Sequence, residues 1–355
     1  MDREQYAKSS YRDDKGFIES FGQGERNRIA DPYQSGRGRM SELFIYGREC
    51  ASALRNEIGK AVIGQDYMIE RILIGLLSGG HILLEGVPGL AKSLTASTVA
   101  KAIGVDFKRI QFTPDLLPAD ILGTEIYNQK TGEFIIKKGP IFTNFILADE
   151  INRSPAKVQS ALLEAMQEKQ VSIGEVTYKL DMPFLVIATQ NPLEQQGTYP
   201  LPEAQQDRFM LKLRIQYPDR DEEREIATRY STDESSVSNI NKIASRDDIF
   251  SMKSCVENIY IDDKIIEYIL DIVFKTREPS AYIACGASPR ASINLIKAAK
   301  CVAFIRGRDY VVPGDVKSIA FDVLRHRILL TYEAEADDVT SEALIAGILE
   351  AVNLP

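Results

Sequence analysis

Histidine and cysteine are scarce in this chain of 355 residues, and tryptophan is missing. The four cysteines include no C-x-x-C pair, which excludes a disulfide framework and the usual spacing of a structural zinc site. The two histidines, His81 and His326, are too few for the ligand set of an H-E-x-x-H metal hydrolase. A Ser-His-Asp triad would have to use one of them, and we expect both to lie outside any catalytic machinery.

Long apolar runs are missing as well. No run approaches the roughly 18 residues that a membrane-spanning helix needs. The N-terminus, which reads MDREQ, has no apolar stretch behind it of the kind found in a secretory signal. The sequence therefore predicts a cytoplasmic protein that touches membranes only through its partners.

The chain also lacks a basic excess. Its 43 Lys and Arg residues against 51 Asp and Glu residues give a net charge of −8. That balance argues against a dedicated nucleic-acid binder but leaves room for a local basic groove. The length suggests two domains, and a hydrophobic fraction of 44% allows a core that needs no disulfide or metal to fold.

The pattern along the chain changes twice. Residues 1–40 are polar and rich in Gly, Ser and Arg, which predicts a disordered extension, and Ser41 is placed to cap the first helix. Residues 41–218 alternate helical patterns with short apolar strands, which predicts an α/β core with a parallel sheet covered on both faces. Residues 219–355 are helical in pattern after the break at Pro218, which predicts a smaller all-α domain. The expected strands are residues 81–84, 105–112, 145–148, 184–188 and 209–215.

The most informative motif is Gly-Val-Pro-Gly-Leu-Ala-Lys-Ser at residues 86–93. It follows a strand and opens a helix that ends at Gly104, which is the context of a P-loop. Backbone N–H groups in such a loop and at the helix N-terminus form a cradle for phosphate oxygens. Lys92 would add a charge at the β- and γ-phosphates, and Ser93 would ligate Mg²⁺. Ala91 replaces the usual Gly before the Lys, so we expect this residue to keep a negative φ.

Two further strands end in polar residues. Asp149 and Glu150 follow the strand at residues 145–148. Asn191 follows the strand at residues 184–188, within Thr-Gln-Asn-Pro. At the carboxyl edge of a parallel sheet these side chains would meet the phosphates. Asp149 would hold Mg²⁺ through water, Glu150 would orient and deprotonate the attacking water, and the neutral amide of Asn191 would hold water near the γ-phosphate.

Two arginines complete the set. Arg208 lies just before the last expected strand. Arg290 follows Ser288 and Pro289, which fit the N-cap and the first position of a helix. A cation in the first helical turn opposes the helix dipole at a cost of about 0.3–1 kcal/mol. An anion such as ATP beside Arg290 would offset that cost. The alternative for both arginines is a surface ion pair.

Together these motifs resemble those of the AAA+ ATPases and, within them, of the MoxR family. The resemblance runs from about residue 41 to the C-terminus. It implies a P-loop core with a five-stranded parallel sheet flanked by helices, followed by a helical lid. In the MoxR form of the Walker A motif, Ala before Lys is usual. The other matching segments are Walker B at residues 148–153, sensor 1 at 188–192, the arginine-finger box at 203–209 and sensor 2 at 286–290.

The resemblance also implies a role for each matching residue, with ATP and Mg²⁺ as cofactors. Arg208 would act on a neighbouring subunit's ATP, and Arg290 would act in cis from the lid. The implied catalytic residues are Glu150, Lys92, Asn191, Arg208 and Arg290, and the implied metal ligands are Ser93 and Asp149. The implied nucleotide-binding residues are Gly86, Val87, Pro88, Gly89, Leu90, Ala91, Lys92, Ser93, Leu94 and Arg290, with Ile63, Gly64 and Gln65 near the adenine.

Two stretches of alternating residues predict hairpins. Residues 171–178 alternate around Gly174-Glu175, a type II′ turn signal. Residues 124–136 alternate around residues 130–132, after a short segment rich in Pro and Asp. They resemble the pre-sensor-1 hairpin and the helix-2 insert of the clade that holds MoxR proteins, magnesium-chelatase motors and MCM helicases. There both elements line or approach the ring's central surface, so both are candidate contacts with a partner.

The resemblance implies a chaperone-like, Mg²⁺-dependent ATPase that works as a hexameric ring. It would mature or activate partner proteins, often ones with von Willebrand factor A domains. A magnesium-chelatase motor subunit would share these motifs and is one alternative. An MCM-like nucleic-acid motor is a second, although the net charge of −8 and the lack of a dense Lys/Arg run count against it. A nucleotide-gated scaffold without turnover is a third, against which Glu150, Asn191 and Arg208 argue.

Overall fold

The computed structural model of the chain describes residues 32–192, 197–232 and 240–355. Residues 1–40 and residues 41–355 form separate units, and the second unit contains every predicted motif. The disorder expected for residues 1–31 lies outside the described residues. Within the described ranges, no helix has both the length and the apolar character needed to cross a membrane.

The first helix, α1 (Pro32–Ala61), begins earlier than the sequence pattern indicated. Ser41 lies inside this helix, so its predicted role as an N-cap is wrong, and residues 32–40 are helical rather than irregular. Proline suits a helix start because its φ is already helical and its missing N–H would have no helical acceptor there. Serine in a helix interior costs only a few tenths of a kcal/mol more than alanine, so Ser41 does not stop the helix.

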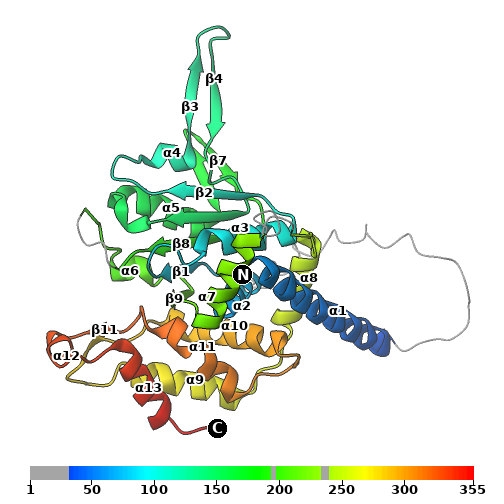
Figure 1. The fold of residues 1–355 in the computed structure, drawn as a ribbon, viewed down its shortest axis with the longest axis vertical. Coiled ribbons are helices and arrows are strands. Elements are labelled where there is room, and N and C mark those ends of the chain that lie inside the picture. The colour runs from blue at the N-terminus through cyan, green and yellow to red at the C-terminus, as the bar shows by residue number, and fades with distance from the viewer. Residues whose placement is uncertain (1–31, 193–196, 233–239) are drawn as a thin grey trace, which may run out of the picture. The chain divides into compact units, whose positions relative to one another are not determined.

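A five-stranded parallel sheet forms the centre of the second unit, in the order β2-β5-β8-β1-β9 (Figure 1). This confirms the predicted strands and their parallel arrangement. β5 and β8 are central and buried on both faces, which explains their unbroken apolar runs. The strands are β1 (Ile82–Glu85), β2 (Phe107–Gln111), β5 (Phe145–Asp149), β8 (Leu185–Gln190) and β9 (Leu211–Arg214).

Alternate side chains of these strands enter two different hydrophobic clusters, as the two-residue period of a strand requires. Ile82 and Leu84 of β1 pack in one cluster with α2 (Asp66–Ser78) and α3 (Lys92–Ile103). Leu83 packs in the other cluster with α5 (Ala156–Glu168). The sheet is therefore covered on both faces.

Both predicted hairpins are present. β6 (Gln170–Ile173) pairs with β7 (Val176–Lys179) around a two-residue turn in which Gly174 has φ 59°, as a type II′ turn requires. β3 (Gly123–Asn128) pairs with β4 (Glu133–Lys138) and projects beyond the sheet (Figure 1). The short helix α4 (Pro118–Leu122) precedes β3, and the 3-10 helix η1 (Ile151–Arg153) follows β5.

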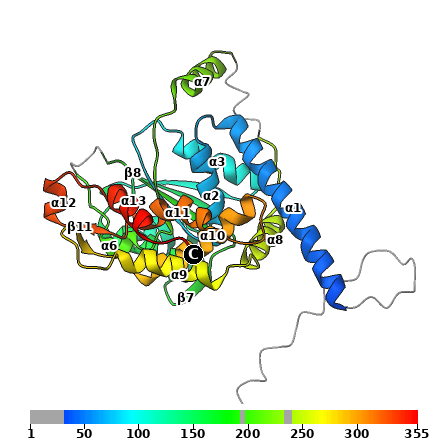
Figure 2. The ribbon, with the colours of Figure 1, turned by 90° about the horizontal axis from the view of Figure 1, so that it is seen from below.

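The chain after Pro218 is helical, as expected. Asp219 caps α7 by accepting hydrogen bonds from the N–H groups of Asp221 and Glu222 at 2.9 Å. Figure 2 shows α7 apart from the helices that follow it. The helices from α6 onward are α6 (Glu203–Gln206), α7 (Arg220–Thr232), α8 (Arg246–Glu257), α9 (Asp263–Lys275), α10 (Pro289–Ile305), α11 (Pro313–Leu324), α12 (Tyr332–Ala336) and α13 (Ser341–Ala351).

One small sheet departs from the expected all-α lid. β10 (Ile283–Cys285) pairs antiparallel with β11 (Leu329–Leu330). Strands of three and two residues are too short to show an alternating pattern in the sequence, so only the pairing partner reveals them.

A buried ion-pair network joins α2 to α11. The Asp322 carboxylate is almost fully buried and accepts hydrogen bonds at 2.7 Å from Arg71 Nε and from Arg325 Nη1. Tyr67 also donates to it, and burial together with Asp322 raises the pKa of Tyr67. Because each charge here is compensated by a partner, removing one of them leaves the other buried and unpaired.

We therefore predict that Asp322→Ala lowers the free energy of unfolding by about 3–5 kcal/mol, measured by urea denaturation. Asp271 is exposed on α9, and the control Asp271→Ala should stay within about 0.5 kcal/mol of the parent chain. A urea midpoint that is unchanged in Asp322→Ala would show that these ion pairs do not stabilise the contact between α2 and α11.

Candidate functional site

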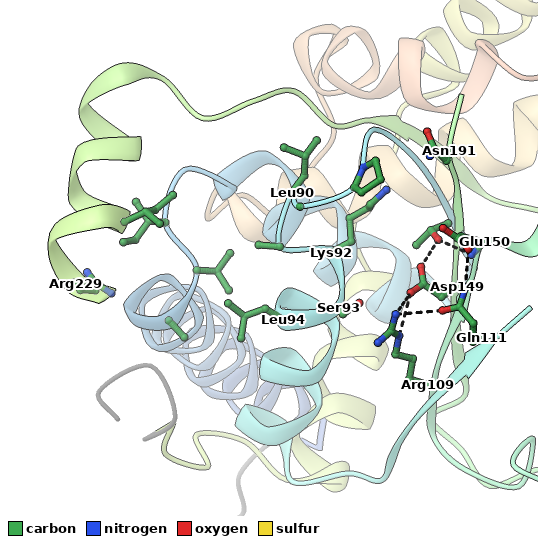
Figure 3. Close-up of a pocket in the computed structure, with 18 residues that line it drawn as sticks. Leu90, Lys92, Ser93, Leu94, Arg109, Gln111, Asp149, Glu150, Asn191 and Arg229 are labelled. Carbon is green, nitrogen blue, oxygen red and sulfur yellow. Dashed lines mark hydrogen bonds and ion pairs between the residues drawn. The ribbon is translucent and has the colours of Figure 1, made fainter. Parts of the chain in front are cut away.

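A cavity of about 520 Å³ lies at the carboxyl ends of β5 and β8, beside the N-terminus of α3 (Figure 3). Lys92, Asp149, Glu150 and Asn191 gather on one side of it, as the geometry of a parallel sheet predicts. The predicted site residues that line this cavity are Ile63, Pro88, Gly89, Leu90, Ala91, Lys92, Ser93, Leu94, Asp149, Glu150 and Asn191.

The loop between β1 and α3 turns through left-handed backbone. Ala91 has φ 55° and ψ 18° at the N-cap of α3, so the expectation of a negative φ is wrong. This conformation costs a residue with a Cβ atom about 1–2 kcal/mol. The loop must reverse its direction here so that α3 can start at the cavity. The left-handed conformation is therefore required whichever residue stands at position 91. Gly89 also has a positive φ, of 88°.

The first turn of α3 presents hydrogen-bond donors to the cavity. Its first helical hydrogen bond runs from the Thr95 N–H to the Ala91 carbonyl at 2.8 Å. The N–H groups of residues 92–94 precede it and have no helical acceptor. Together with the positive end of the helix dipole they form an anion cradle.

Lys92 adds a cation at the same place. Its ammonium donates to the Gly86 carbonyl at 2.6 Å, across the loop. Burial lowers the pKa of Lys92, and the carboxylates of Asp149 and Glu150 oppose that shift. The Lys92 ammonium group therefore lies between the anion cradle and the two carboxylates.

Asp149, at the end of β5, is held by the strands on either side. Thr189 on β8 donates to its Oδ1 atom at 2.6 Å. Arg109 on β2 donates to its Oδ2 atom, from Nη2 at 2.6 Å and from Nε at 3.0 Å. Both carboxylate oxygens are therefore fixed at the cavity wall.

Glu150 follows directly in left-handed backbone, with φ 56°. Its N–H donates to Thr189 Oγ1 at 2.8 Å, so one threonine positions both acidic residues. Gln111 Nε2 donates to Glu150 Oε2 at 2.7 Å, and Arg153 Nε lies 3.3 Å from the same oxygen. Strained backbone of this kind costs about 1–3 kcal/mol and persists where surrounding contacts hold it.

Sequence reasoning missed Arg109, Gln111 and Thr189. The sequence spacing contains part of the information needed to find two of them. Residues 109 and 111 are two apart and therefore lie on the same face of a strand. Gln111 pairs in register with Asp149, which brings its amide beside the acidic pair. That register cannot be read from the sequence, since β2 and β5 are separated by the β3–β4 hairpin.

The wall opposite the carboxylates comes from two helices. Residues 61–63 at the end of α1 line it together with Ile226 and Arg229 of α7, and Figure 3 shows Arg229 far from Glu150 across the cavity. Arg229 donates to the Lys60 carbonyl, which ties α7 to the end of α1. No local pattern indicates the contribution of α7, because it depends on where the chain after Pro218 folds back.

Five predicted nucleotide-binding residues do not line the cavity: Arg290, described below, and four residues in the turns before α2 and α3. Gly86 and Val87 lie in the loop before it, and the Gly86 carbonyl instead accepts the Lys92 hydrogen bond. Gly64 has φ 69° and serves the turn between α1 and α2. Gln65 is buried and donates to the Gln216 carbonyl at 3.4 Å.

Neither predicted arginine lies in the cavity. Arg290 is in the first turn of α10, as predicted, and its guanidinium lies 3.6 Å from the Asp207 carboxylate. Ser288 occupies the N-cap of α10, but its hydroxyl donates to Asp207 at 3.0 Å rather than capping the backbone. Arg208 is partly exposed, and no ion pair of its side chain is found among the described residues.

Both histidines are buried away from the cavity, as expected. His81 Nδ1 accepts from the Val186 N–H at 3.0 Å, and Nε2 lies 3.1 Å from the Met166 carbonyl. Burial lowers the pKa of His81 to about 4 and lowers that of His326 as well. Neutral imidazoles in these places are part of the core.

Mg²⁺ fits this cavity as an ion bound mainly to phosphate and water. Among the residues that the structure describes, no cluster of three His, Cys, Asp or Glu side chains could hold a metal. Mg²⁺ in nucleotide sites takes only one or two carboxylates from the protein and keeps several waters. Ser93 and Asp149, which both line the cavity, provide the oxygen donors that such an ion needs.

Two family models match the chain. The model for the ATPase family associated with various cellular activities (AAA) matches residues 81–211. The model for the AAA lid domain matches residues 277–348. The first covers strands β1, β2, β5 and β8 and the cavity residues from the P-loop onward, and ends at the start of β9; the second covers most of α10–α13.

Relatives extend the likeness beyond these two segments. The chain is 50% identical over 307 residues to the chaperone MoxR1 of Mycobacterium tuberculosis, covering 84% of this chain and 81% of that protein. It is 47% identical over 299 residues to the uncharacterized protein YeaC of Bacillus subtilis, covering 84% and 92%. A crystal structure of a candidate ATPase from Cytophaga hutchinsonii superposes with a TM-score of 0.84 at 52% identity, covering 91% of this chain and 99% of that one. The chain therefore belongs to the MoxR family of AAA+ ATPases.

Proposed function

We propose that this protein hydrolyses Mg²⁺-bound ATP in the cavity beside α3 and uses the energy to remodel or activate protein partners. The observation that carries the proposal is the convergence of Lys92, Asp149, Glu150 and Asn191 on the free N-terminus of α3. A phosphate cradle, a cation, an acidic pair and a neutral amide are the parts that phosphoryl transfer to water requires.

Each side chain has a separate task in this proposal. The amides of residues 92–94 and the Lys92 ammonium bind the phosphates and stabilise the charge that develops during transfer. Glu150, aimed by Gln111, orients the attacking water and takes its proton. Asn191 holds that water close to the γ-phosphate without adding a negative charge. When bound, Mg²⁺ neutralises phosphate charge, and Ser93 and Asp149 would hold it.

Ring assembly is the second part of the proposal. Arg208 is partly exposed and lies outside its own cavity, which suits a residue that acts on a neighbouring subunit's ATP. An arginine supplied in trans is worth about 10³–10⁵ in rate in GTPase systems, so a hexameric ring would couple assembly to turnover. We assign residues 41–218 to the nucleotide-binding core and residues 219–355 to the lid, from which Arg290 would act in cis.

The partner is the third part. The similarity to the chaperone MoxR1 and to the MoxR family supports a protein client, and we propose one with a von Willebrand factor A domain. The β3–β4 hairpin is the contact we favour, because apolar side chains crowd its exposed surface. Ile126, Tyr127, Phe134 and Ile135 are 47–68% exposed, and such clusters often mark interaction sites.

We predict that Glu150→Gln abolishes ATP turnover while ATP binding stays within about threefold of the parent chain. The amide keeps the shape of the carboxylate but cannot take a proton from water. Phosphate release and nucleotide titration measure the two properties. Glu164 is exposed on α5, and Glu164→Gln is the matched control. Turnover that survives in Glu150→Gln would remove Glu150 from the mechanism.

Mixing variants tests whether Arg208 acts in trans. Arg208→Ala and Glu150→Gln should each be inactive alone, since each lacks one part of every site. Mixed rings should regain turnover, because a Glu150→Gln subunit supplies Arg208 to a neighbour with an intact Glu150. Arg290→Ala mixed with Glu150→Gln should regain nothing, as Arg290 acts within its own subunit. Equal behaviour of the two mixtures would contradict the assignment.

Client capture tests the partner. Glu150→Gln rings held in the ATP state in cells should enrich proteins with von Willebrand factor A domains over the parent chain, as identified by mass spectrometry. Adding Phe134→Ser in the β3–β4 hairpin should reduce that capture. Tyr332→Ser is the matched control, because Tyr332 is 90% exposed on α12. Capture that lacks these proteins would refute the proposed client, and capture that Phe134→Ser leaves intact would refute the hairpin contact.

A further inference from the structure

A second cavity, of about 260 Å³, lies away from the nucleotide cavity. It is bordered by α2, α8 and α10, which pack side by side (Figure 1), and by the end of α5. Its apolar lining includes Leu77, Val256 and Ile296. The charged side chains around it are Lys169, Lys253, Lys297, Lys300 and Glu257.

The four lysines outnumber the acids at this cavity, where Glu257 is the one carboxylate among the described lining residues. Among the described residues, none of their ammonium groups forms an ion pair with a carboxylate. Lys300 donates to the backbone carbonyl of Glu257 at 3.1 Å. The whole chain has a net charge of −8, so composition does not account for a basic cavity. Four cations around one small opening repel each other unless an anion joins them.

Lys169 is also held in strained backbone. It ends α5 with φ 53°, a left-handed position that Gly or Asn usually fills. Four non-glycine residues have a positive φ in the described chain, and two of them, Ala91 and Glu150, lie at the nucleotide cavity. Strain that the fold maintains is concentrated at binding sites. Lys169 is exposed, but partial loss of water contact lowers the pKa of its ammonium group, and Lys253 and Lys297 lower it further.

We propose that this basic cavity binds a compact polyphosphate anion of about the size of pyrophosphate. Lysine binds phosphate as a point charge, and Lys169, Lys253 and Lys297 supply three such charges from three helices. The cavity is smaller than the roughly 300–1,000 Å³ that drug-sized ligands occupy, which favours a small, dense anion. Because α2 and α5 precede residue 218 and α8 and α10 follow it, the anion would tie the core to the lid.

The lysines could instead serve only to stabilise helix ends, and that role predicts the opposite effect of replacing them on stability. Helices α2, α5 and α8 all end at this cavity, and cations stabilise helix C-termini. If the lysines served only as helix caps, replacing them would destabilise the protein and no anion would restore it. If they form an anion site, replacing two of them relieves repulsion and leaves the unliganded protein at least as stable.

Pyrophosphate titration separates the two roles. All variants carry Lys92→Ala, so that the P-loop contributes little to phosphate binding. Lys169→Met with Lys297→Met should weaken pyrophosphate binding at least about tenfold by calorimetry, and pyrophosphate should no longer raise the melting temperature. Lys157 and Lys264 are exposed elsewhere, and replacing both by Met removes the same charge and should leave binding unchanged. Ionic strength is kept constant throughout.

The outcomes that would overturn the proposal are equally definite. Equal pyrophosphate affinity in the two double variants would place the binding elsewhere. A lower melting temperature of the Lys169→Met, Lys297→Met chain, with no effect of pyrophosphate on the parent, would leave helix capping as the role. A rise in melting temperature with a glutamate-rich peptide but not with pyrophosphate would show that the ligand class is wrong. Should the double variant not fold, Lys253→Met alone carries the same test.

Discussion

The parallel register of the sheet is the constraint on which the site depends. β5 pairs with β8 from Phe145 opposite Leu185, and β2 pairs with β5 up to Gln111 opposite Asp149. The polar residues that follow each strand therefore reach the same edge. The P-loop follows β1 at that same edge, and α3 starts directly after the P-loop. The anion cradle and the acidic pair therefore face one cavity. A shift of register by one residue would turn every side chain of the shifted strand to the opposite face of the sheet and separate these groups.

The stability of the core maintains strained backbone at this edge. Ala91 and Glu150 both have left-handed backbone conformations, each of which is unfavourable for a residue with a side chain. Hydrogen bonds from Thr189, Gln111 and Arg109 fix the acidic pair that this backbone presents. Two apolar clusters, one on each face of the sheet, supply the free energy that offsets the strain.

A second polar network connects the sheet to the helices after Pro218. Arg327 has no exposed side-chain surface; its Nε donates to Asp207 at 2.8 Å, and its Nη2 donates to the Phe209 carbonyl at 2.6 Å. Burial lowers the pKa of Arg327 to about 10 although Asp207 raises it. The Asp207 carboxylate also accepts a hydrogen bond from the Ser288 hydroxyl and lies close to the Arg290 guanidinium. The residue directly before Arg208 is thus fixed by three groups from the later helices, so a movement of those helices would displace Arg208.

Much of the fold was predictable because its signals are local. Apolar runs, Gly and Pro at the turns, and the P-loop spacing identified all five strands of the main sheet, α3 and both hairpins. They also identified Lys92, Asp149, Glu150 and Asn191 as neighbours, since the strand ends of a parallel sheet must meet. Local signals were weaker at helix ends, where Pro32 and Ser41 were both acceptable starts, and at β10 and β11, which are too short to show a period.

The tertiary structure alone decided which residues from distant parts of the chain complete the sites. Gln111 and Arg109 reach the acidic pair through strand register, Ile226 and Arg229 reach the cavity through the path of α7, and Arg290 meets Asp207 instead of the cavity. The basic cavity is the clearest case, because its four lysines are spread between residues 169 and 300. The sequence determined which chemistry each segment carries, since that follows from side chains and local backbone. Long-range packing decided which of those groups share a site, because it sets distances that no local pattern records.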